Sequence, residues 1–254
     1  MEITFLGTGT SQGVPVIGCN CEVCQSQDYR DKRLRTSALI RIDDINILID
    51  AGPDFRQQML REDISSIDAI LFTHEHKDHV GGLDDVRAFN FMSKSAMEVY
   101  AEQRVQEALR KEYSYIFADK PYPGVPRLHL NTIENQKFEI KGITIIPIRI
   151  MHYHLPILGY RIGDLTYITD ASYIPDEEKH KVHGSKYLVI NALRVEKHMS
   201  HFNIEEALQI INECAPRKAY LTHMSHYIGK HEEMLKILPD NVQPAFDGLR
   251  VEVL

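Results

Sequence analysis

The segment 73–79, with the sequence THEHKDH, constrains this chain more than any other, because four metal-binding side chains fall within six residues. Neutral imidazoles and a carboxylate are ligands that zinc, iron and manganese accept. His74 and His76 lie two residues apart, so in an extended segment they point to the same side. Asp78 and His79 follow where a loop can fold them toward a second ion. The alternative is a polar, solvated loop, but this spacing seldom occurs without a metal.

The chain has 254 residues, which is enough to bury a substantial core. No stretch resembles a flexible linker, so we expect one domain covering residues 1–254. The composition, 43% hydrophobic and 26% charged, is that of an ordinary globular protein. A net charge of −7 argues against broad nucleic-acid binding, which requires a basic surface. It does not exclude a small anionic substrate, because bound divalent metals invert the local charge.

The sequence carries no sign of a membrane or export segment. No apolar run approaches the ~18 residues of a membrane span, and the start, MEITFLGTGT, lacks the basic and apolar regions of a signal peptide. The chain has four cysteines, which without export signals are expected as thiolates rather than disulfides. We therefore expect a cytoplasmic protein with no membrane partner.

Three cysteines lie close together near the start of the chain, at Cys19, Cys21 and Cys24. This density is typical of a structural zinc knuckle that lacks its fourth ligand, which must come from elsewhere. The alternative is a set of redox-active or incidental thiols. The basic run 30–35 that follows predicts a solvated face, with Arg33 or Arg35 as an alternative contact for a phosphate.

Apolar runs alternate with turn residues and amphipathic segments along most of the chain. Two strands joined by Asp43-Asp44 predict a hairpin, and the Gly-rich loop 7–11 predicts a tight turn that brings backbone near the site. The segment 113–126, rich in tyrosine and proline, predicts irregular structure, either a lid over the site or an insertion packed by its own tyrosines. Strands are expected at 1–6, 37–42, 45–49, 67–72, within 138–170, and at 187–191, 218–222 and 248–253, and helices at 54–61, 83–91, 101–111, 203–214 and 232–238.

The second half, from about residue 140, repeats the order of the first: strand pairs, then metal-capable residues at strand ends, then helices. This pattern predicts two sheets packed face to face with helices outside, an α/β (α+β) architecture. His74, His152, Asp170 and His223 each follow an apolar strand, so we expect them to converge at one edge. Asp50 also ends a strand, either as a turn former or as an acceptor that orients a metal-bound histidine.

The number of ligands suffices for two metal ions. His74, His76 and one further histidine would hold one ion, while Asp78, His79 and His223 would hold the other. Asp170 could bridge both. In two-metal sites, ions ~3.5–4 Å apart clamp a bridging water, whose pKa falls toward ~7. The expected cofactors are therefore two divalent ions, zinc or manganese with iron as a third option.

The HxHxDH motif, together with the later histidine, Asp170 and His223, resembles the metallo-β-lactamase superfamily. The resemblance covers nearly the whole chain, including the terminal run 246–249. It implies a four-layer αβ/βα sandwich that carries a binuclear metal site. The motif is specific for the superfamily but not for a substrate.

Further residues resemble one branch of that superfamily. Asp78 followed by His79 is usual in members that hydrolyse phosphodiesters, thioesters and lactones, whereas classical lactamases lack this histidine. His201, before a predicted helix, resembles the acid-base histidine of the tRNA 3′-processing endonucleases and of the smaller PhnP-like phosphoribosyl 1,2-cyclic phosphate phosphodiesterases. The PhnP-like enzymes also carry a zinc knuckle closed by a histidine, which here would be His226 with Cys19, Cys21 and Cys24.

The resemblance implies a metallo-hydrolase, most simply a phosphodiesterase for a small cyclic phosphodiester, in which a metal-bridged hydroxide attacks phosphorus. Asp78 and His201 would be its catalytic residues, with His201 as general acid. The alternatives are a tRNA or RNA 3′-processing endonuclease, or a thioesterase or lactonase. His154 remains an alternative to His152 as ligand, and His198 an alternative to His201 as acid. We expect a small phosphodiester substrate, no nucleic-acid partner, and a homodimer as in many relatives.

Overall fold

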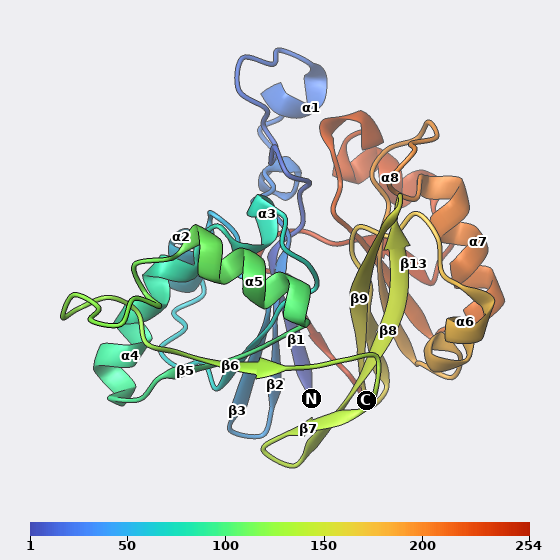
Figure 1. The fold of residues 1–254 in the computed structure, drawn as a ribbon. Coiled ribbons are helices and arrows are strands. Elements are labelled where there is room, and N and C mark those ends of the chain that lie inside the picture. Colours follow the sequence, from blue (N-terminus) through green and yellow to red (C-terminus); the bar gives the residue numbers. More distant parts are fainter.

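A computed structural model describes residues 1–254, and its strands form two seven-stranded sheets that face each other (Figure 1). Across the first sheet the order is β14 (Arg250–Glu252), β1 (Glu2–Gly7), β2 (Ser37–Ile42), β3 (Ile45–Ile49), β4 (Ala69–Leu71), β5 (Met97–Ala101) and β6 (Leu128–Thr132). Across the second sheet it is β13 (Val242–Pro244), β12 (Lys218–Thr222), β11 (Tyr187–Asn191), β10 (Leu165–Tyr167), β9 (Leu155–Ile162), β8 (Ile143–His152) and β7 (Phe138–Ile140).

Both sheets are mixed. The strands β3 to β6 run parallel in the first sheet, and β10 to β13 run parallel in the second. Parallel neighbours need crossover connections, and helices supply most of them here. The chain first forms β1 to β6 of the first sheet, then the whole second sheet, and returns to the first with β14, which pairs antiparallel with β1.

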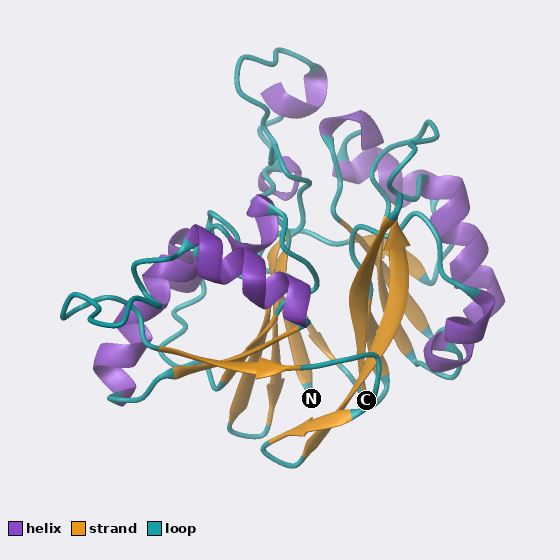
Figure 2. Cartoon of the chain, in the orientation of Figure 1, coloured by secondary structure: helices purple, strands orange, loops and turns teal.

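Helices cover the outer faces of the two sheets (Figure 2). None of them is both long and apolar enough to cross a membrane. The α-helices are α1 (Glu22–Gln25), α2 (Phe55–Arg61), α3 (Lys77–Val80), α4 (Arg87–Ser93), α5 (Gln103–Glu112), α6 (Asp176–Val182), α7 (Ile204–Cys214) and α8 (His231–Ile237), and the 3₁₀ turns are η1 (Tyr29–Asp31), η2 (Leu83–Val86) and η3 (His226–Ile228).

Successive side chains of a strand point to opposite faces of the sheet, so the apolar side chains fall into three layers of core. On β3, Ile47 and Ile49 point into the core between the sheets, while Leu48 packs under the helices outside. The inner core also takes Leu158 and Tyr160 from β9 of the second sheet. The resulting order of layers, helix, sheet, sheet and helix, confirms the predicted four-layer αβ/βα sandwich.

The predicted elements differ from the structure in several places. Three strands, β5, β6 and β13, and the helices α1 and α6 were not predicted. The helix expected at 83–91 is instead η2 followed by α4, and the motif segment includes one helical turn, α3, rather than only loop. These elements are short, and short elements give little periodicity to read.

One further expectation is corrected, and one pair of alternatives that the sequence left open is resolved. The run 30–35 is not a solvated face, because Arg33 is buried and donates hydrogen bonds to Thr8 Oγ1 at 3.0 Å and to the carbonyl of Ala245 at 2.6 Å. The segment 113–126 packs on the first half rather than over the gap between the sheets (Figure 1). Its Tyr113 hydroxyl donates to the carbonyl of Val80 at 2.7 Å.

Candidate metal centre

Three histidines from the two halves of the molecule meet at one edge of the sandwich. His74 and His76 follow β4, and His152 ends β8. The ring centroids of His74 and His76 lie 4.5 Å apart, and those of His76 and His152 lie 5.1 Å apart. One nitrogen from each ring can lie within 4.8 Å of the others, close enough to share one metal ion.

A second group lies beside the first and consists of Asp78, His79, Asp170 and His223, whose ligand atoms also lie within 4.8 Å of one another. His79 Nε2 is 3.2 Å from a carboxylate oxygen of Asp78 and 3.2 Å from one of Asp170. His223 Nε2 is 3.1 Å from Asp170 Oδ1. Asp170 also forms a metal-capable set with His152 and His201, so it lies between the two groups.

Each of four histidines is held by a hydrogen bond from its Nδ1, which leaves Nε2 directed into the centre. His79 donates to Asp50 Oδ2 at 2.7 Å, and His152 donates to the carbonyl of Ser200 at 2.7 Å. His74 donates to the hydroxyl of Thr73 at 3.0 Å, which itself donates to Asp50.

His223 completes this arrangement. Its Nδ1 donates to Thr36 Oγ1 at 3.1 Å, since that hydroxyl donates onward to the carbonyl of Gly9 at 2.7 Å. The loop 7–11 therefore approaches the site, as its glycines predicted, because Gly9 forms a bridge with Met224.

The four histidines fit a divalent metal. Ligating histidines usually donate their second ring N–H to a carboxylate, hydroxyl or carbonyl, which fixes the tautomer. Here Nε2 of His74 and Nε2 of His79 are buried and have no hydrogen-bond partner in the protein. A buried, unpaired nitrogen is unfavourable unless a ligand satisfies it, and carboxylate oxygens of Asp78 and Asp170 lie 3.2 Å from the nitrogen of His79.

The backbone at three of these positions is unusual. Asp50, Asp170 and His223 have φ angles of 62°, 59° and 52° in the left-handed region. Aspartate tolerates this region better than most residues, but histidine there is uncommon. Each residue follows a strand, so the turn redirects its side chain toward the common edge, in the manner of strain found at functional sites.

Burial and charge set the protonation of the centre. Burial lowers the pKa of His74 well below its usual range and lowers the pKa of His223 to about 4. For His79, burial opposes protonation, but Asp170, Asp78 and Asp50 outweigh it and raise its pKa well above its usual range. Neutral imidazole is the form that binds a metal, so His79 holds a proton that a cation would displace.

His201 lies at the rim of the centre, on the loop before α7. Its Nε2 is 3.1 Å from Asp170 Oδ1, and its ring centroid is 4.6 Å from that of His152. His198 lies farther out, with Nδ1 3.2 Å from Nδ1 of His201. His154 is exposed in the turn after β8, where it stacks on Tyr153, and does not join either group.

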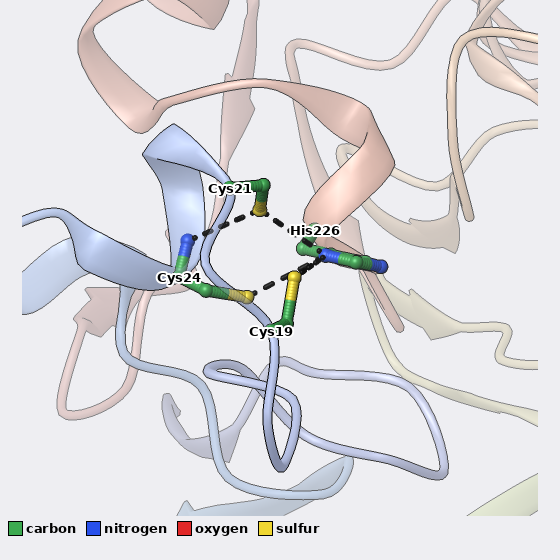
Figure 3. A group of neighbouring side chains, drawn as sticks. All are labelled: Cys19, Cys21, Cys24 and His226. Atoms are coloured by element: carbon green, nitrogen blue, oxygen red, sulfur yellow. Dashed lines mark hydrogen bonds between the residues drawn. The ribbon is translucent and has the colours of Figure 1, made fainter.

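The three cysteines predicted to form a knuckle converge on one histidine (Figure 3). The sulfurs of Cys19, Cys21 and Cys24 lie 3.3, 3.3 and 3.5 Å from Nδ1 of His226, which comes from η3. A hydrogen bond from the backbone N–H of Cys24 lowers the pKa of the Cys21 thiol to about 6. The three cysteines form no disulfide, and together with His226 they form a set suited to tetrahedral zinc.

The structure thus brings together every predicted site residue, and it adds four supports that were not singled out: Thr10, Thr36, Thr73 and the carbonyl of Ser200. Thr10 Oγ1 lies 3.2 Å from His223 Nε2. Thr73 directly precedes His74, so a polar residue next to a candidate histidine was the available signal for it. Ser200 gave none, because it acts through a backbone carbonyl, which every residue carries. Thr36 gave none, because its contact depends on tertiary packing.

Comparison with known proteins places this fold and site in a family. The model of the beta-lactamase superfamily domain matches residues 45–224. The chain belongs to the metallo-β-lactamase superfamily, which confirms the resemblance. Within it, the chain belongs to the PhnP family, since it is 38% identical to a diphosphatase of that family, with a TM-score of 0.93 and coverage of 100% of this chain and 98% of the other.

Other relatives are more distant or longer. A protein of Porphyromonas gingivalis named octanoyltransferase is 46% identical over 98% of this chain, but the chain spans only 51% of its length. A ribonuclease Z of Thermosynechococcus vestitus is 29% identical over 65% of this chain and 37% of its own length. The zinc-bound PqqB of Methylobacterium extorquens, 18% identical with a TM-score of 0.82 and covering 100% of both chains, shares the fold.

Proposed function

We propose that this protein is a metal-dependent hydrolase of a small phosphodiester or diphosphate. The observation that carries the proposal is the shared orientation of four histidines, His74, His79, His152 and His223, whose Nδ1 atoms are all engaged by protein acceptors. The 38% identical diphosphatase supports a phosphorus-containing substrate.

The two groups of side chains would each hold one divalent ion. His74, His76 and His152 would hold the first, and Asp78, His79, Asp170 and His223 the second. When bound, two such ions supply Lewis acidity, which activates water and neutralises charge on phosphoryl oxygens. The donor set accepts zinc, manganese or iron. The Cys3His set formed by Cys19, Cys21, Cys24 and His226 would hold a structural zinc.

His201 would donate a proton to the leaving alkoxide or phosphate oxygen. Its Nε2 is 3.1 Å from Asp170 Oδ1, which places the ring beside the proposed metal centre, where a leaving oxygen would need a proton. Asp78 and Asp170 would supply the negative charge that holds a divalent ion next to the reacting phosphate, and Asp50 keeps His79 in the correct tautomer.

A small substrate fits the charge of the protein better than RNA does. The net charge of −7 gives no support for binding a polyanion over a long surface, whereas metal ions can attract a compact phosphate locally. We propose a small-molecule partner, no nucleic-acid partner and a homodimer. Filter binding with tRNA at rising salt tests the first two: salt-sensitive, tight binding would contradict them.

A second candidate is the hydrolysis or transfer of an acyl group from a thioester. It is favoured by the 46% identity to the protein named octanoyltransferase, although this chain spans only 51% of that protein. A thioester carbonyl can also be polarised by metal ions.

A substrate panel separates the candidates. The metal-loaded protein would be given bis(p-nitrophenyl) phosphate, a nucleoside diphosphate ester, a small cyclic phosphate, octanoyl thioester and a lactone, with kcat/KM measured for each. The proposal expects a phosphodiester or diphosphate to be turned over fastest. Turnover of the octanoyl thioester with no reaction at phosphorus would reject it in favour of the second candidate.

A further inference from the structure

One arginine outside the proposed ligand set ties together the two segments that carry the three-histidine group. Arg104 lies in the first turn of α5, whose beginning faces β8 and β9 across the gap between the sheets (Figure 1). Its Nη1 pairs with the carboxylate of Glu75, the residue between His74 and His76. Its Nη2 donates to the carbonyl of Pro156 at 2.7 Å.

Each of these two acceptors is next to a candidate metal ligand. Glu75 belongs to the segment between β4 and α3, which has no regular secondary structure of its own. Pro156, on β9, pairs across the hairpin with Met151, the neighbour of His152 on β8. Arg104 therefore links the loop of His74 and His76, in the first half, to the hairpin of His152, in the second.

Few other polar contacts hold these two segments together near the site. The backbone N–H of Leu158 donates to the carbonyl of Thr73 at 3.1 Å, and the hydroxyl of Tyr160 donates to the carbonyl of Phe72 at 2.6 Å. Both contacts fix the chain before His74. Arg104 is the contact that fixes it after His74, where the backbone continues to His76.

The chemistry of the side chain suits this role. A guanidinium is planar and offers several donors in a fixed fork, so a single arginine can satisfy a carboxylate and a carbonyl at once. A lysine, with a compact ammonium group on a flexible stem, holds two acceptors with less defined geometry. The side chain of Arg104 is about one-third exposed, at 35%, so its removal is not expected to disrupt the core.

We propose that Arg104 is a positioning residue that sets the separation of His76 and His152, and thereby the metal affinity of the three-histidine group. It acts through Glu75 and Pro156 and forms no hydrogen bond to a candidate metal ligand. This inference rests on the proposed function only in that the three histidines bind a metal. It needs no particular substrate.

The test measures metal binding rather than turnover. Protein stripped of metal would be titrated with Co²⁺, and the visible absorption of each bound equivalent would be recorded for wild type, Arg104→Ala, Arg104→Lys and Glu75→Gln. Changes in residues that support ligating histidines typically weaken binding ten- to hundredfold. We expect Arg104→Ala to weaken one equivalent of Co²⁺ by about tenfold, with an altered spectrum, and Arg104→Lys to recover part of the loss.

Arg110→Ala is the matched control. Arg110 lies near the other end of the same helix, α5, where its guanidinium is 4.8 Å from the ring centroid of Phe117. Loss of Co²⁺ affinity equal to that of Arg104→Ala would show a general structural effect and overturn the proposal.

A double-mutant cycle adds an independent readout. If Arg104 acts through Glu75, the double variant Glu75→Gln/Arg104→Ala loses less affinity than the sum of the two single losses. Additive losses, or wild-type affinity and spectrum in Arg104→Ala, would overturn the proposal. A wild-type protein that binds no Co²⁺ beyond the cysteine set would instead refute the proposed metal centre itself.

Discussion

Asp50 Oδ2 accepts a hydrogen bond from Nδ1 of His79 at 2.7 Å, and both side chains are fully buried. The same oxygen accepts from the hydroxyl of Thr73 at 2.9 Å, and that hydroxyl accepts from His74. One carboxylate therefore orients a histidine of each metal group. Because His74 and His79 face the centre through Nε2, the geometry of both groups depends on Asp50.

Replacing Asp50 with Asn should weaken the binding of both metal ions. The amide has nearly the same shape but lacks the negative charge that favours the required tautomer of His79, and such changes cost about 10- to 100-fold in metal affinity. Competition with a chromophoric chelator measures this loss.

Asp54→Asn is a useful control for Asp50→Asn, because Asp54 pairs with Arg35 at 3.1 Å and contacts neither metal group. Its metal affinity should remain that of wild type. An Asp50→Asn variant that kept full affinity for both ions would show that Asp50 is only a turn former.

Replacing His201 with Ala should reduce kcat by about 10²- to 10⁴-fold, the usual contribution of a general acid. Metal content should remain unchanged, which elemental analysis of the purified variant would establish. This point matters because His201, with His152 and Asp170, could itself hold a metal. Loss of one ion together with activity would make His201 a ligand instead.

His198→Ala provides the comparison for His201→Ala. His198 lies behind His201 and does not reach Asp170, so we expect a change in kcat of less than about tenfold, below the contribution of a general acid. If His198→Ala were the more damaging substitution, the assignment of the proton donor would move to His198.

Replacing Cys21 with Ser should remove one zinc per chain and lower the stability of the protein, because binding at a structural zinc site contributes directly to folding. The serine hydroxyl is a poor zinc ligand compared with a thiolate. Zinc stoichiometry and the midpoint of thermal unfolding measure the two effects.

Cys214 is the natural control for Cys21, because it is a buried thiol on α7 far from the other three in sequence. Cys214→Ala should keep all of its zinc. Unchanged zinc content in Cys21→Ser would mean that the cysteine set is not a metal site.

The affinity of the second group for metal should rise with pH beyond the usual titration range of histidine. The carboxylates around His79 outweigh its burial and raise its pKa well above 6.5, so the metal-free protein holds this proton at neutral pH. Metal binding must release it, and affinity then increases by about tenfold per pH unit for each proton displaced. The increase should continue above pH 6.5 up to the raised pKa.

Calorimetric titrations in buffers of different ionisation enthalpy count the released protons directly. We expect about one proton per ion bound at the second group at pH 7. An affinity that levels off near pH 6.5, with no proton release at pH 7, would contradict this protonation of His79.

Much of the fold was predictable because its strands have clear patterns. The strands at Ser37–Ile42, Ile45–Ile49, Tyr187–Asn191 and Lys218–Thr222 have the predicted bounds. The strands β5 and β6 were not predicted, since both are short and interrupted by polar residues: His129 and Asn131 lie on β6, at the edge of the sheet, and contact Glu98 on β5. That the whole chain is one domain stays a prediction, which a single cooperative unfolding transition would support.

The candidate site was predictable where its ligands share one feature, a position shortly after the end of a strand. His74, Asp170 and His223 each follow a strand, and the convergence of strand ends follows from sheet geometry alone. The choice of His152 over His154 required the structure, because only one residue of a tight turn faces the site. The roles of Arg104 and Thr36 could not be predicted from the sequence. Each contacts residues far away along the chain, Pro156 and His223 respectively, and only the fold brings them together.

Metal reconstitution tests the central claim most directly. Protein stripped by chelation would be loaded with Mn²⁺ or Zn²⁺ in steps, and the rate of bis(p-nitrophenyl) phosphate hydrolysis would be recorded against the number of ions bound per chain. We expect no turnover without metal and full turnover once two ions are bound beyond the cysteine set. Asp170→Asn should not recover at any loading. Turnover in the stripped protein, or full recovery of Asp170→Asn, would contradict a hydrolase built on these two groups.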